Sequence, residues 1–391
     1  MSCFALEERV PLHFTDQEFA HRKAETLARM DNEGLDGLLM FRQESMYYLT
    51  GYDTFGFVFF QCLFLKSDGR LTLLTRAPDA RAARYTSNIE DIRIWADGPD
   101  ADPANDLKEI LREHGCAGRR LGVEWEAYGL TAQNGRRLST ALEGFCRLED
   151  ASLLITRQRV VKRPAEIAYV RKAAELADRA LAEGLKLARP GAFEGDILAA
   201  IQGEVFKGDG DYSGNEFIIG SGPAAHLGRY TSGRRHIAEG EQLTLEFAGV
   251  YRHYHSCLMR VVTIGKATAR QAEVHQHAMH ALEASSNALR PGEPVGNVFN
   301  AYISTIEKAG FTENNLNACG YSLGTTFSPN WMDWPMLYRD NPVIAEPGMV
   351  FFMFLPITDR GVSAVPGETF LVTETGSERL GKSPIISAAE N

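Results

Sequence analysis

The segment 243–265, LTLEFAGVYRHYHSCLMRVVTIG, gathers several side chains that can carry out chemistry. Its residues predict two strands around a short turn, with Glu246 following Leu243 and Leu245. Because successive side chains of a strand point to opposite faces, Glu246 points away from the leucine face. If this second face lines a pocket, Glu246 can bind a cationic group or activate water. If the face is open to solvent, Glu246 is an ordinary solvated strand residue. The residues alone leave both interpretations open.

His255 and Cys257 lie further along the same segment and offer a second kind of chemistry. Two residues apart on one strand, they share a face, so a thiolate nucleophile beside an imidazole is geometrically possible. We favour the alternative, in which Cys257 is a buried thiol that packs as a small apolar group.

Two further residues are candidates for acid–base work or for binding. His226 ends the segment GSGPAAH at 220–226, and an imidazole suits proton transfer because its unperturbed pKa is close to neutral. The alternative is an ordinary loop histidine with satisfied hydrogen bonds. Glu368, in GETFLV, has the same two interpretations as Glu246.

Three aromatic side chains, Tyr321, Trp331 and Trp334, follow one another closely in the last third of the chain. Aromatic faces bind desolvated cations with roughly 0.5–2 kcal/mol each, so these residues are candidates for a wall that binds a cationic ligand. Ordinary packing is the alternative.

These side chains need a scaffold, and the length of 391 residues predicts two domains. Residues 1–155 alternate helical and strand patterns, which predicts a layered α/β domain. Residues 156–391 begin with a long helix at Pro164 and continue as an α+β domain. The predicted helices cover about 16–34, 104–114, 164–190, 193–207, 267–290 and 296–310, and the predicted strands lie near 35–41, 57–65, 71–74, 120–124, 216–220 and 242–264.

Composition narrows the function classes. The net charge of -10 argues against nucleic acid or an anionic membrane as partner, and no apolar stretch is long enough to span a bilayer. The N-terminal MSCFALEERVPLHF has no basic region followed by an apolar one, so we expect a cytoplasmic protein.

Several motifs together resemble the creatinase/aminopeptidase superfamily, whose catalytic domain has the pita-bread fold. The motifs are RVVKRPAEIAYVRKAAELAD, GSGPAAH, the strand pair at 243–265, CGYSLG, AEPGMVF and ETFLVTETGSERL, in the family's order. The resemblance implies a creatinase-like α/β domain over 1–155 and an α+β pita-bread catalytic domain over 156–391.

Metallopeptidases of this superfamily hold two divalent ions with two Asp, one His and two Glu, and this chain departs from that set. In order, the corresponding positions are Glu246, Cys257, Tyr321, the pair Phe354 and Leu355 before Pro356, and Gly367 with Glu368 beside it. One Glu, one Cys and one Tyr do not make a two-metal clamp. We therefore expect no metal and no cofactor.

The chain is similar instead to the metal-independent branch that includes creatinase and the ectoine hydrolases. Shared features are Glu246, Ala248-Gly249, Tyr254-His255, Gly320-Tyr321-Ser322 and Pro329-Asn330-Trp331. The resemblance implies that His226 transfers protons while Glu246 and Glu368 bind or orient, and that Arg339 binds a substrate carboxylate. Its other implied substrate-binding residues are Tyr321, Trp331, Tyr254, His255, Cys257, and Phe55 and Phe57 from the neighbouring protomer of a homodimer with shared active sites.

The expected function is metal-independent hydrolysis of a C–N bond in a small zwitterionic or cationic nitrogen compound. The substrate is expected to be a compatible solute such as an ectoine-like ring, or a guanidino or amidino compound such as creatine. Three alternatives stay open: an osmolyte lyase acting on dimethylsulfoniopropionate, a metal-dependent Xaa-Pro dipeptidase, and an inactive small-molecule binding protein.

Overall fold

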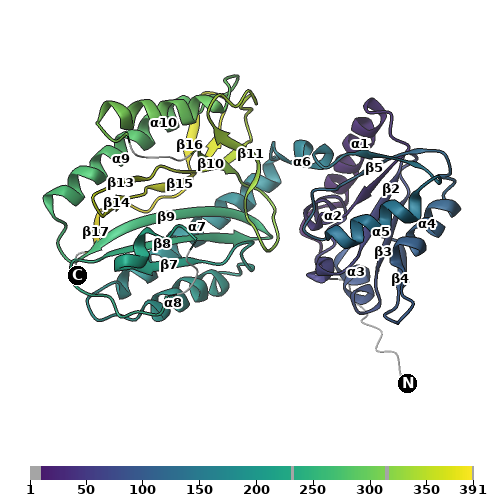
Figure 1. Ribbon diagram of the computed structural model, residues 1–391, viewed down its shortest axis with the longest axis horizontal. Coiled ribbons are helices and arrows are strands. Elements are labelled where there is room, and N and C mark those ends of the chain that lie inside the picture. The colour runs from purple at the N-terminus through teal and green to yellow at the C-terminus, as the bar shows by residue number, and fades with distance from the viewer. Residues whose placement is uncertain (1–9, 230–232, 313–316, 390–391) are drawn as a thin grey trace. The chain divides into compact units, whose positions relative to one another are not determined.

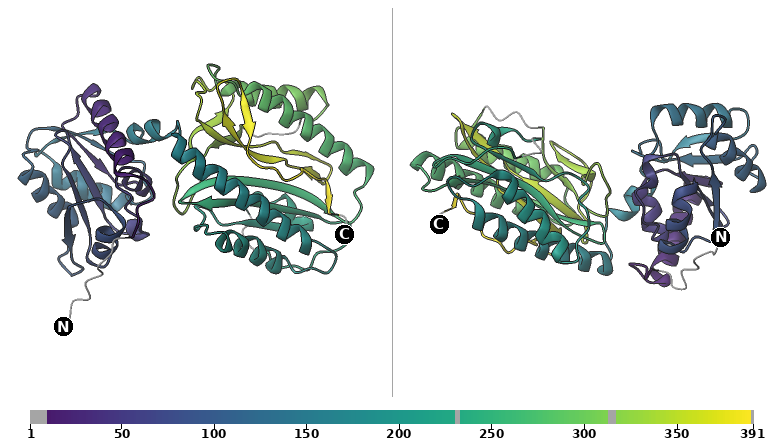
Figure 2. Two further views of the ribbon diagram at one scale, coloured as in Figure 1. Left: turned by 180° about the vertical axis from the view of Figure 1, so that it is seen from behind. Right: turned by 90° about the horizontal axis from the view of Figure 1, so that it is seen from below.

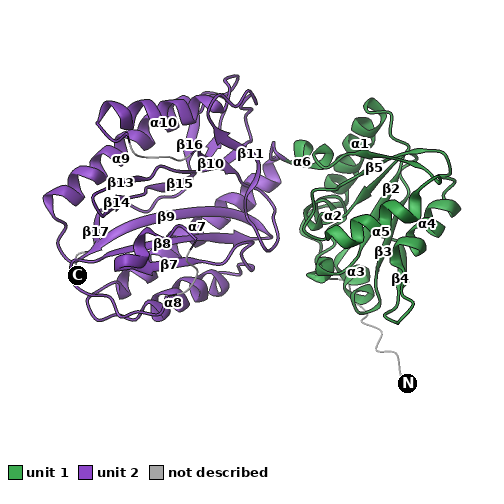
Figure 3. Ribbon diagram, in the orientation of Figure 1, with its two compact units in different colours: residues 1–159 green, residues 160–391 purple. Residues whose placement is uncertain are grey.

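The computed structural model describes residues 10–229, 233–312 and 317–389. The chain divides into two compact units, residues 1–159 and 160–391 (Figures 1 and 3). The predicted division after residue 155 falls inside helix α6 (Leu154–Arg159), the last element of unit 1.

Unit 1 is a six-stranded mixed sheet in the order β4-β3-β2-β1-β5-β6. Its strands are β1 (Gly37–Met40), β2 (Cys62–Lys66), β3 (Leu71–Arg76), β4 (Asp91–Trp95), β5 (Arg120–Val123) and β6 (Arg147–Asp150). Its helices are α1 (Asp16–Asn32), α2 (Gln43–Thr50), α3 (Ala80–Thr86), α4 (Pro103–Glu113), α5 (Ala132–Leu142) and α6, with short 3-10 turns η1 (Gly56–Val58) and η2 (Ala77–Asp79).

Both faces of this sheet are buried under helices. Along β1, Leu38 and Met40 enter one apolar cluster, while Leu39 enters a second cluster on the other face. Alternation along a strand therefore explains why residues 38–41, LLMF, are all apolar, as in a strand that is buried on both faces. The structure differs from the prediction in two respects. Residues 57–65 begin with η1 rather than a strand, and several elements of unit 1 were not predicted: helices α2, α3, α5 and α6 and strands β4 and β6.

Unit 2 is built on one large sheet whose main path runs β11-β10-β12-β15-β9-β8-β7. Its strands are β7 (Ile218–Ser221), β8 (Gln242–Tyr251), β9 (Tyr254–Ile264), β10 (Ala318–Ser322), β11 (Asp333–Tyr338), β12 (Val350–Phe354), β15 (Gly367–Val372), β16 (Ser377–Arg379) and β17 (Ala388–Ala389), beside a small pair β13 (Ile357–Asp359) and β14 (Val362–Ala364). The helices are α7 (Pro164–Leu187), α8 (Glu194–Lys207), α9 (Ala269–Ala288) and α10 (Gly296–Lys308), with the 3-10 turn η3 (Gly222–His226).

Helix α7 begins at Pro164, as predicted, and lies against β8 and β9 (Figure 2). The Glu166 side chain accepts a hydrogen bond of 3.0 Å from the Arg163 backbone N–H and so caps the helix start. Gly249 permits the close approach, because a Cβ atom there would overlap the Ala173 carbonyl oxygen. The odd-numbered side of β8 thus faces α7.

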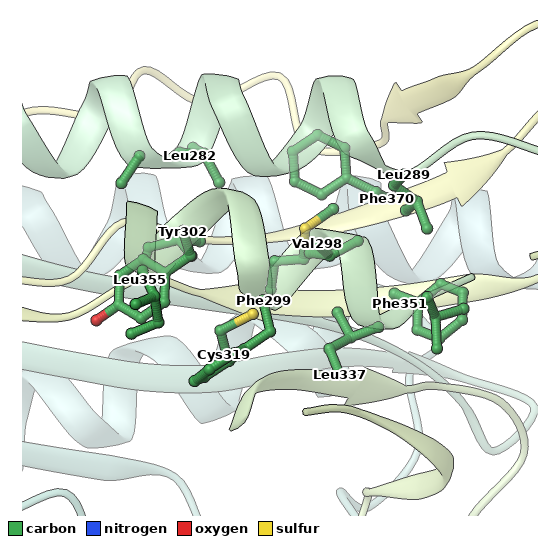
Figure 4. Packing of buried hydrophobic residues seen from close by; sticks show 14 of the residues in the cluster. Leu282, Leu289, Val298, Phe299, Tyr302, Cys319, Leu337, Phe351, Leu355 and Phe370 are labelled. Atoms are coloured by element: carbon green, nitrogen blue, oxygen red, sulfur yellow. The ribbon is translucent and has the colours of Figure 1, made fainter. Parts of the chain in front are cut away.

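The other half of the sheet carries α9 and α10 on an apolar core that includes Leu282, Phe299 and Phe351 (Figure 4). Phe351 and Met353 of β12 belong to this core, so Phe352 and Phe354 point to the opposite face of the sheet. Among the described residues, the helices are either too short or too polar to cross a membrane.

Candidate active site

A cavity of about 690 Å³ lies in unit 2, on the face of β8 opposite α7. Its lining comes from β7 to β12, the loop around His226 and the small pair β13–β14. Of the residues predicted for the site, four line this cavity: His226, Glu246, Tyr321 and Trp331.

The sheet register explains why these side chains meet. Glu246 pairs with Met259 across β8 and β9, Met259 with Gly367 of β15, and Gly367 with Phe354 of β12. Directly paired residues share a face, so this row crosses four strands on the cavity side. Tyr321 of β10 pairs with Phe352, two residues before Phe354, and therefore faces the same way.

Glu246 is 9% exposed, and its carboxylate makes no hydrogen bond with any described residue. Burial raises the pKa of Glu246 from 4.5 to about 7, and the positive charge of Arg229 opposes that rise. A carboxyl group of this kind holds or releases a proton near neutral pH, which suits a general base or the binding of a cation.

His226 is held by a hydroxyl network at the rim of the cavity. Its Nδ1 lies 2.9 Å from the Ser363 Oγ, and Gln242 fixes the Ser363 backbone through bonds of 2.9 Å and 2.7 Å. Thr244 donates a 2.6 Å hydrogen bond to the Ala225 carbonyl, which ties the turn before His226 to β8. The Nε2 atom makes no hydrogen bond with the described residues and remains available for proton transfer.

Tyr321 and Trp331 act as a pair rather than as two separate faces. The Trp331 indole N–H donates a 2.8 Å hydrogen bond to the Tyr321 hydroxyl oxygen, and both residues are buried. Burial, with the nearby Cys257 and Glu246, raises the pKa of Tyr321 well above its ordinary value. Tyr321 is therefore a neutral phenol whose proton is directed away from the indole, so it can donate to a bound ligand.

Arg229 is a residue that the sequence analysis missed. It is exposed, lines the cavity and is the cation whose charge acts on Glu246. Its one signal in the sequence was its position three residues after His226 in HLGR. Arg339, predicted to bind a carboxylate, is not in the lining and lies with its guanidinium 5.5 Å from the Phe299 ring.

Glu368 does not line the cavity either, because it follows Gly367 and strand alternation turns it to the helix side. There it is fully buried and forms an ion pair with Arg260, while Arg379 lies 3.9 Å away. Burial raises the pKa of Glu368, and the two arginines oppose that rise. The predicted carboxylate thus faces away from the cavity and joins β15 to β9.

The other residues predicted from the strand pair are fully buried and do not line the cavity. The His255 Nε2 accepts a 2.9 Å hydrogen bond from the Gly214 N–H, and burial lowers the pKa of His255 to about 3, so the ring is neutral. Tyr254 donates a 2.7 Å hydrogen bond to Glu166. Burial and the charge of Glu246 raise the pKa of the Cys257 thiol well above its ordinary value, which disfavours a thiolate nucleophile.

Three predicted aromatic residues lie elsewhere. Trp334 packs against the apolar core beneath α9 and α10. Phe55 and Phe57 belong to unit 1, where Phe55 is 77% exposed and Phe57 only 7%.

The fold and the site together define a two-domain protein of the creatinase/aminopeptidase class with a pita-bread catalytic domain. Residues 168–374 match metallopeptidase family M24, and residues 22–161 match the creatinase/prolidase N-terminal domain. The chain belongs to the M24 family, which is a family of hydrolases.

Relatives and solved structures agree with this assignment over nearly the full length. A hydrolase/peptidase of Sinorhizobium fredii whose activity is uncharacterized is 28% identical over 95% of this chain and 97% of its own. The ectoine hydrolase of Halomonas elongata is 28% identical over 96% of this chain and 98% of its own. The structure of a prolidase from Thermococcus sibiricus superposes with a TM-score of 0.86 at 21% identity, covering 96% of this chain and 100% of that one.

The residues that the sequence analysis matched to the metal ligands of M24 peptidases do not fit a pair of divalent ions. Glu246 and Tyr321 line the cavity with Phe354, Cys257 is fully buried and does not line it, and Gly367 has no side chain. Within the described ranges, no group of three or more His, Cys, Asp or Glu side chains is arranged to hold a metal ion. A side chain at 367 would also overlap the Met259 Cβ, so the missing ligand has no room.

Proposed function

We propose that this chain hydrolyses a C–N bond in a small zwitterionic or cationic nitrogen compound without a metal ion. The proposal depends chiefly on Glu246, a buried carboxylate on the cavity face with a pKa of about 7. Among the described residues, no basic side chain forms an ion pair with it. An amidinium or guanidinium group would supply the missing positive charge, and an ectoine-like ring or a creatine-like guanidine carries one.

Each lining residue then has a role that its surroundings support. Glu246 orients the cationic nitrogen group or takes a proton from water. His226, fixed by Ser363, delivers a proton to the departing nitrogen. Tyr321 donates a hydrogen bond to the oxygen on which negative charge develops, and Arg229 binds the carboxylate of a zwitterionic substrate.

The ectoine hydrolase relative favours a cyclic amidine over an acyclic guanidine, since it aligns with 96% of this chain. The metal-dependent Xaa-Pro dipeptidase alternative requires carboxylates where this chain has Cys257, Phe354 and Gly367. A lyase acting on dimethylsulfoniopropionate and an inactive binding protein would leave the imidazole of His226 without a hydrolytic role.

Homodimerisation with shared active sites is part of the proposal. Phe55 is 77% exposed beside Val58 at 51% and Phe59 at 42%, an apolar cluster around η1 that a second protomer would cover. Phe55→Asp should then lower both the dimer fraction in analytical ultracentrifugation and the turnover.

The test is turnover of ectoine, creatine, dimethylsulfoniopropionate and an Xaa-Pro dipeptide by chelator-treated protein, with metal content measured in parallel. We expect the metal-depleted protein to hydrolyse ectoine or creatine, and His226→Ala to bind that substrate without turning it over. Two stoichiometric metal ions with chelator-sensitive dipeptidase activity would refute the proposal. Binding without turnover in wild type and variant alike would make the chain a binding protein.

A further inference from the structure

His255 is a fully buried histidine of β9 that the proposed chemistry does not use. Each of its ring nitrogens faces a partner with a fixed hydrogen-bonding role. The Gly214 N–H, which can only donate, bonds to Nε2 at 2.9 Å, and the His253 carbonyl oxygen, which can only accept, lies 2.9 Å from Nδ1. The ring therefore carries its proton on Nδ1 and accepts at Nε2. His255 thus holds Gly214 and leaves no ring nitrogen for proton transfer.

Gly214 lies in a stretch of chain that has few other attachments. Before it, the Asp211 N–H donates a 3.1 Å hydrogen bond to the Val250 carbonyl of β8, and after it the chain enters β7. Between these points, within 212–216, the bond to His255 is the one described backbone hydrogen bond to a residue outside the stretch. His255 is therefore the anchor of this stretch.

The residue next to the anchored glycine reaches the active-site cavity. Asn215 lines the cavity and lies three residues before Ile218, which also lines it and pairs with Glu246 across β7 and β8. The Asn215 carboxamide forms no hydrogen bond with the described residues. A carboxamide offers both a donor and an acceptor, so this side chain can bind a polar group of a ligand.

Gly214 also packs closely against another part of the cavity wall. A Cβ atom at Gly214 would lie 2.8 Å from the Asn330 carbonyl oxygen and 3.2 Å from the Trp331 backbone nitrogen, so a side chain does not fit there. Asn330 and Trp331 both line the cavity. The backbone of Gly214 is thus fixed by a hydrogen bond to His255 and by contact with this wall.

We propose that Asn215 is a substrate-binding residue and that His255 is the positioning residue that holds it at the cavity through Gly214. The binding role rests on the proposed function, whereas the positioning role does not. The carboxamide oxygen accepts a hydrogen bond from an N–H group of the substrate. An ectoine-like amidine or a creatine-like guanidine offers such a group, and dimethylsulfoniopropionate has none.

Two substitutions of His255 separate its acceptor from its bulk. The amide oxygen of His255→Gln can take the place of Nε2, whereas the shorter side chain of His255→Asn keeps a donor near Nδ1 and loses the acceptor for Gly214. We expect His255→Asn to speed hydrogen exchange of peptides within 211–217 and to raise the KM for ectoine roughly tenfold, with a smaller change in kcat. His255→Gln should restore both values towards wild type.

Two further variants test the other links of the chain. Asn215→Ala should raise KM to a similar extent and leave the exchange of the Gly214 N–H unchanged, because the anchor is intact. Gly214→Ala displaces the stretch from Asn330, so it should raise both exchange and KM, and it serves if His255→Asn does not fold.

His275→Asn is the matched control, because His275 is a half-buried histidine of the same unit on α9. It should leave exchange within 211–217 and KM unchanged. Unchanged exchange and KM in folded His255→Asn, or equal changes in His255→Gln, would overturn the positioning role.

The binding role has its own outcomes. An unchanged KM in Asn215→Ala would overturn it. If the wild type hydrolyses no ectoine, the proposed substrate fails and the role of Asn215 in binding it fails too, while the exchange comparison still decides the role of His255.

Discussion

Replacing Glu246 by Gln should stabilise the protein and inactivate it at the same time. Burial moves the pKa of this carboxyl from 4.5 to about 7, so the folded protein disfavours the charged form. At about 1.4 kcal/mol for each pKa unit, the penalty is roughly 3 kcal/mol. Glutamine keeps the shape and removes the charge.

The penalty depends on pH in a defined direction. Above about pH 7 Glu246 is ionised in both states, and the folded state carries the full penalty. As the pH falls from about 7 towards 4.5, the folded state takes up a proton first and the penalty disappears. Glu246→Gln should therefore be more stable than wild type by up to about 3 kcal/mol at pH 8 and by almost nothing near pH 4.5.

Urea unfolding followed by circular dichroism at pH 8 and pH 5 measures this difference for the intact chain. Glu374→Gln, an exposed carboxylate of the same unit, is the control and should show no pH-dependent gain. An advantage of Glu246→Gln that is equal at both pH values, or absent at pH 8, would refute the assignment of Glu246 as a desolvated carboxylate. A stable variant that retains turnover would refute its role in catalysis.

Three other substitutions test the neighbouring residues. Glu368→Gln leaves the Arg260 guanidinium buried without its counter-ion and should cost about 3–5 kcal/mol of unfolding free energy; an unchanged urea midpoint would contradict the buried pair. Cys257→Ala should retain most of the turnover, and iodoacetamide should react slowly with the native thiol, because burial keeps it protonated. Alkylation of Cys257 that abolishes activity would instead favour the nucleophile. Tyr321→Phe should lower kcat by about 100- to 1000-fold with little effect on KM, as for loss of one donor to a developing oxyanion, and a change in KM alone would assign Tyr321 to binding.

The architecture followed from the sequence wherever hydrophobic periodicity was long and ended at a clear signal. Helix α7 begins at Pro164 as predicted, and the strand pair around Glu246 pairs residue by residue from Gln242 to Thr263. Helix α2 was not predicted because QESMYYLT is short and buried on most sides, so it lacks the polar face that reveals helical periodicity in a sequence. Its helical state is set by packing in the tertiary structure.

The site was predictable where a strand carried the residue and less so where a loop did. Alternation placed Glu246 opposite its leucines, and the structure puts it on the cavity face. Arg229 and Arg339 are both arginines of loops, and no periodicity tells which of them reaches a pocket formed by distant strands. The Tyr321–Trp331 hydrogen bond likewise joins a strand to a loop, so the sequence indicated two aromatic faces rather than one oriented phenol.

Glu246 and Glu368 show that the face of the sheet on which a buried glutamate lies decides its role. A glutamate on the helix side is structural, and one on the cavity side can take part in chemistry. Both are buried glutamates on strands of the same sheet, and burial raises the pKa of each. Glu368 follows Gly367 onto the helix side, where Arg260 neutralises it and favours its charged form. Glu246 faces the cavity, where the exposed Arg229 compensates it only in part. The two arginines reduce the cost of burying the charge of Glu368, which serves stability. A carboxylate left unpaired in a pocket exchanges its proton near neutral pH and attracts a cationic ligand. Because Gly367 has no side chain, β15 places no acidic neighbour beside Glu246 on the cavity face.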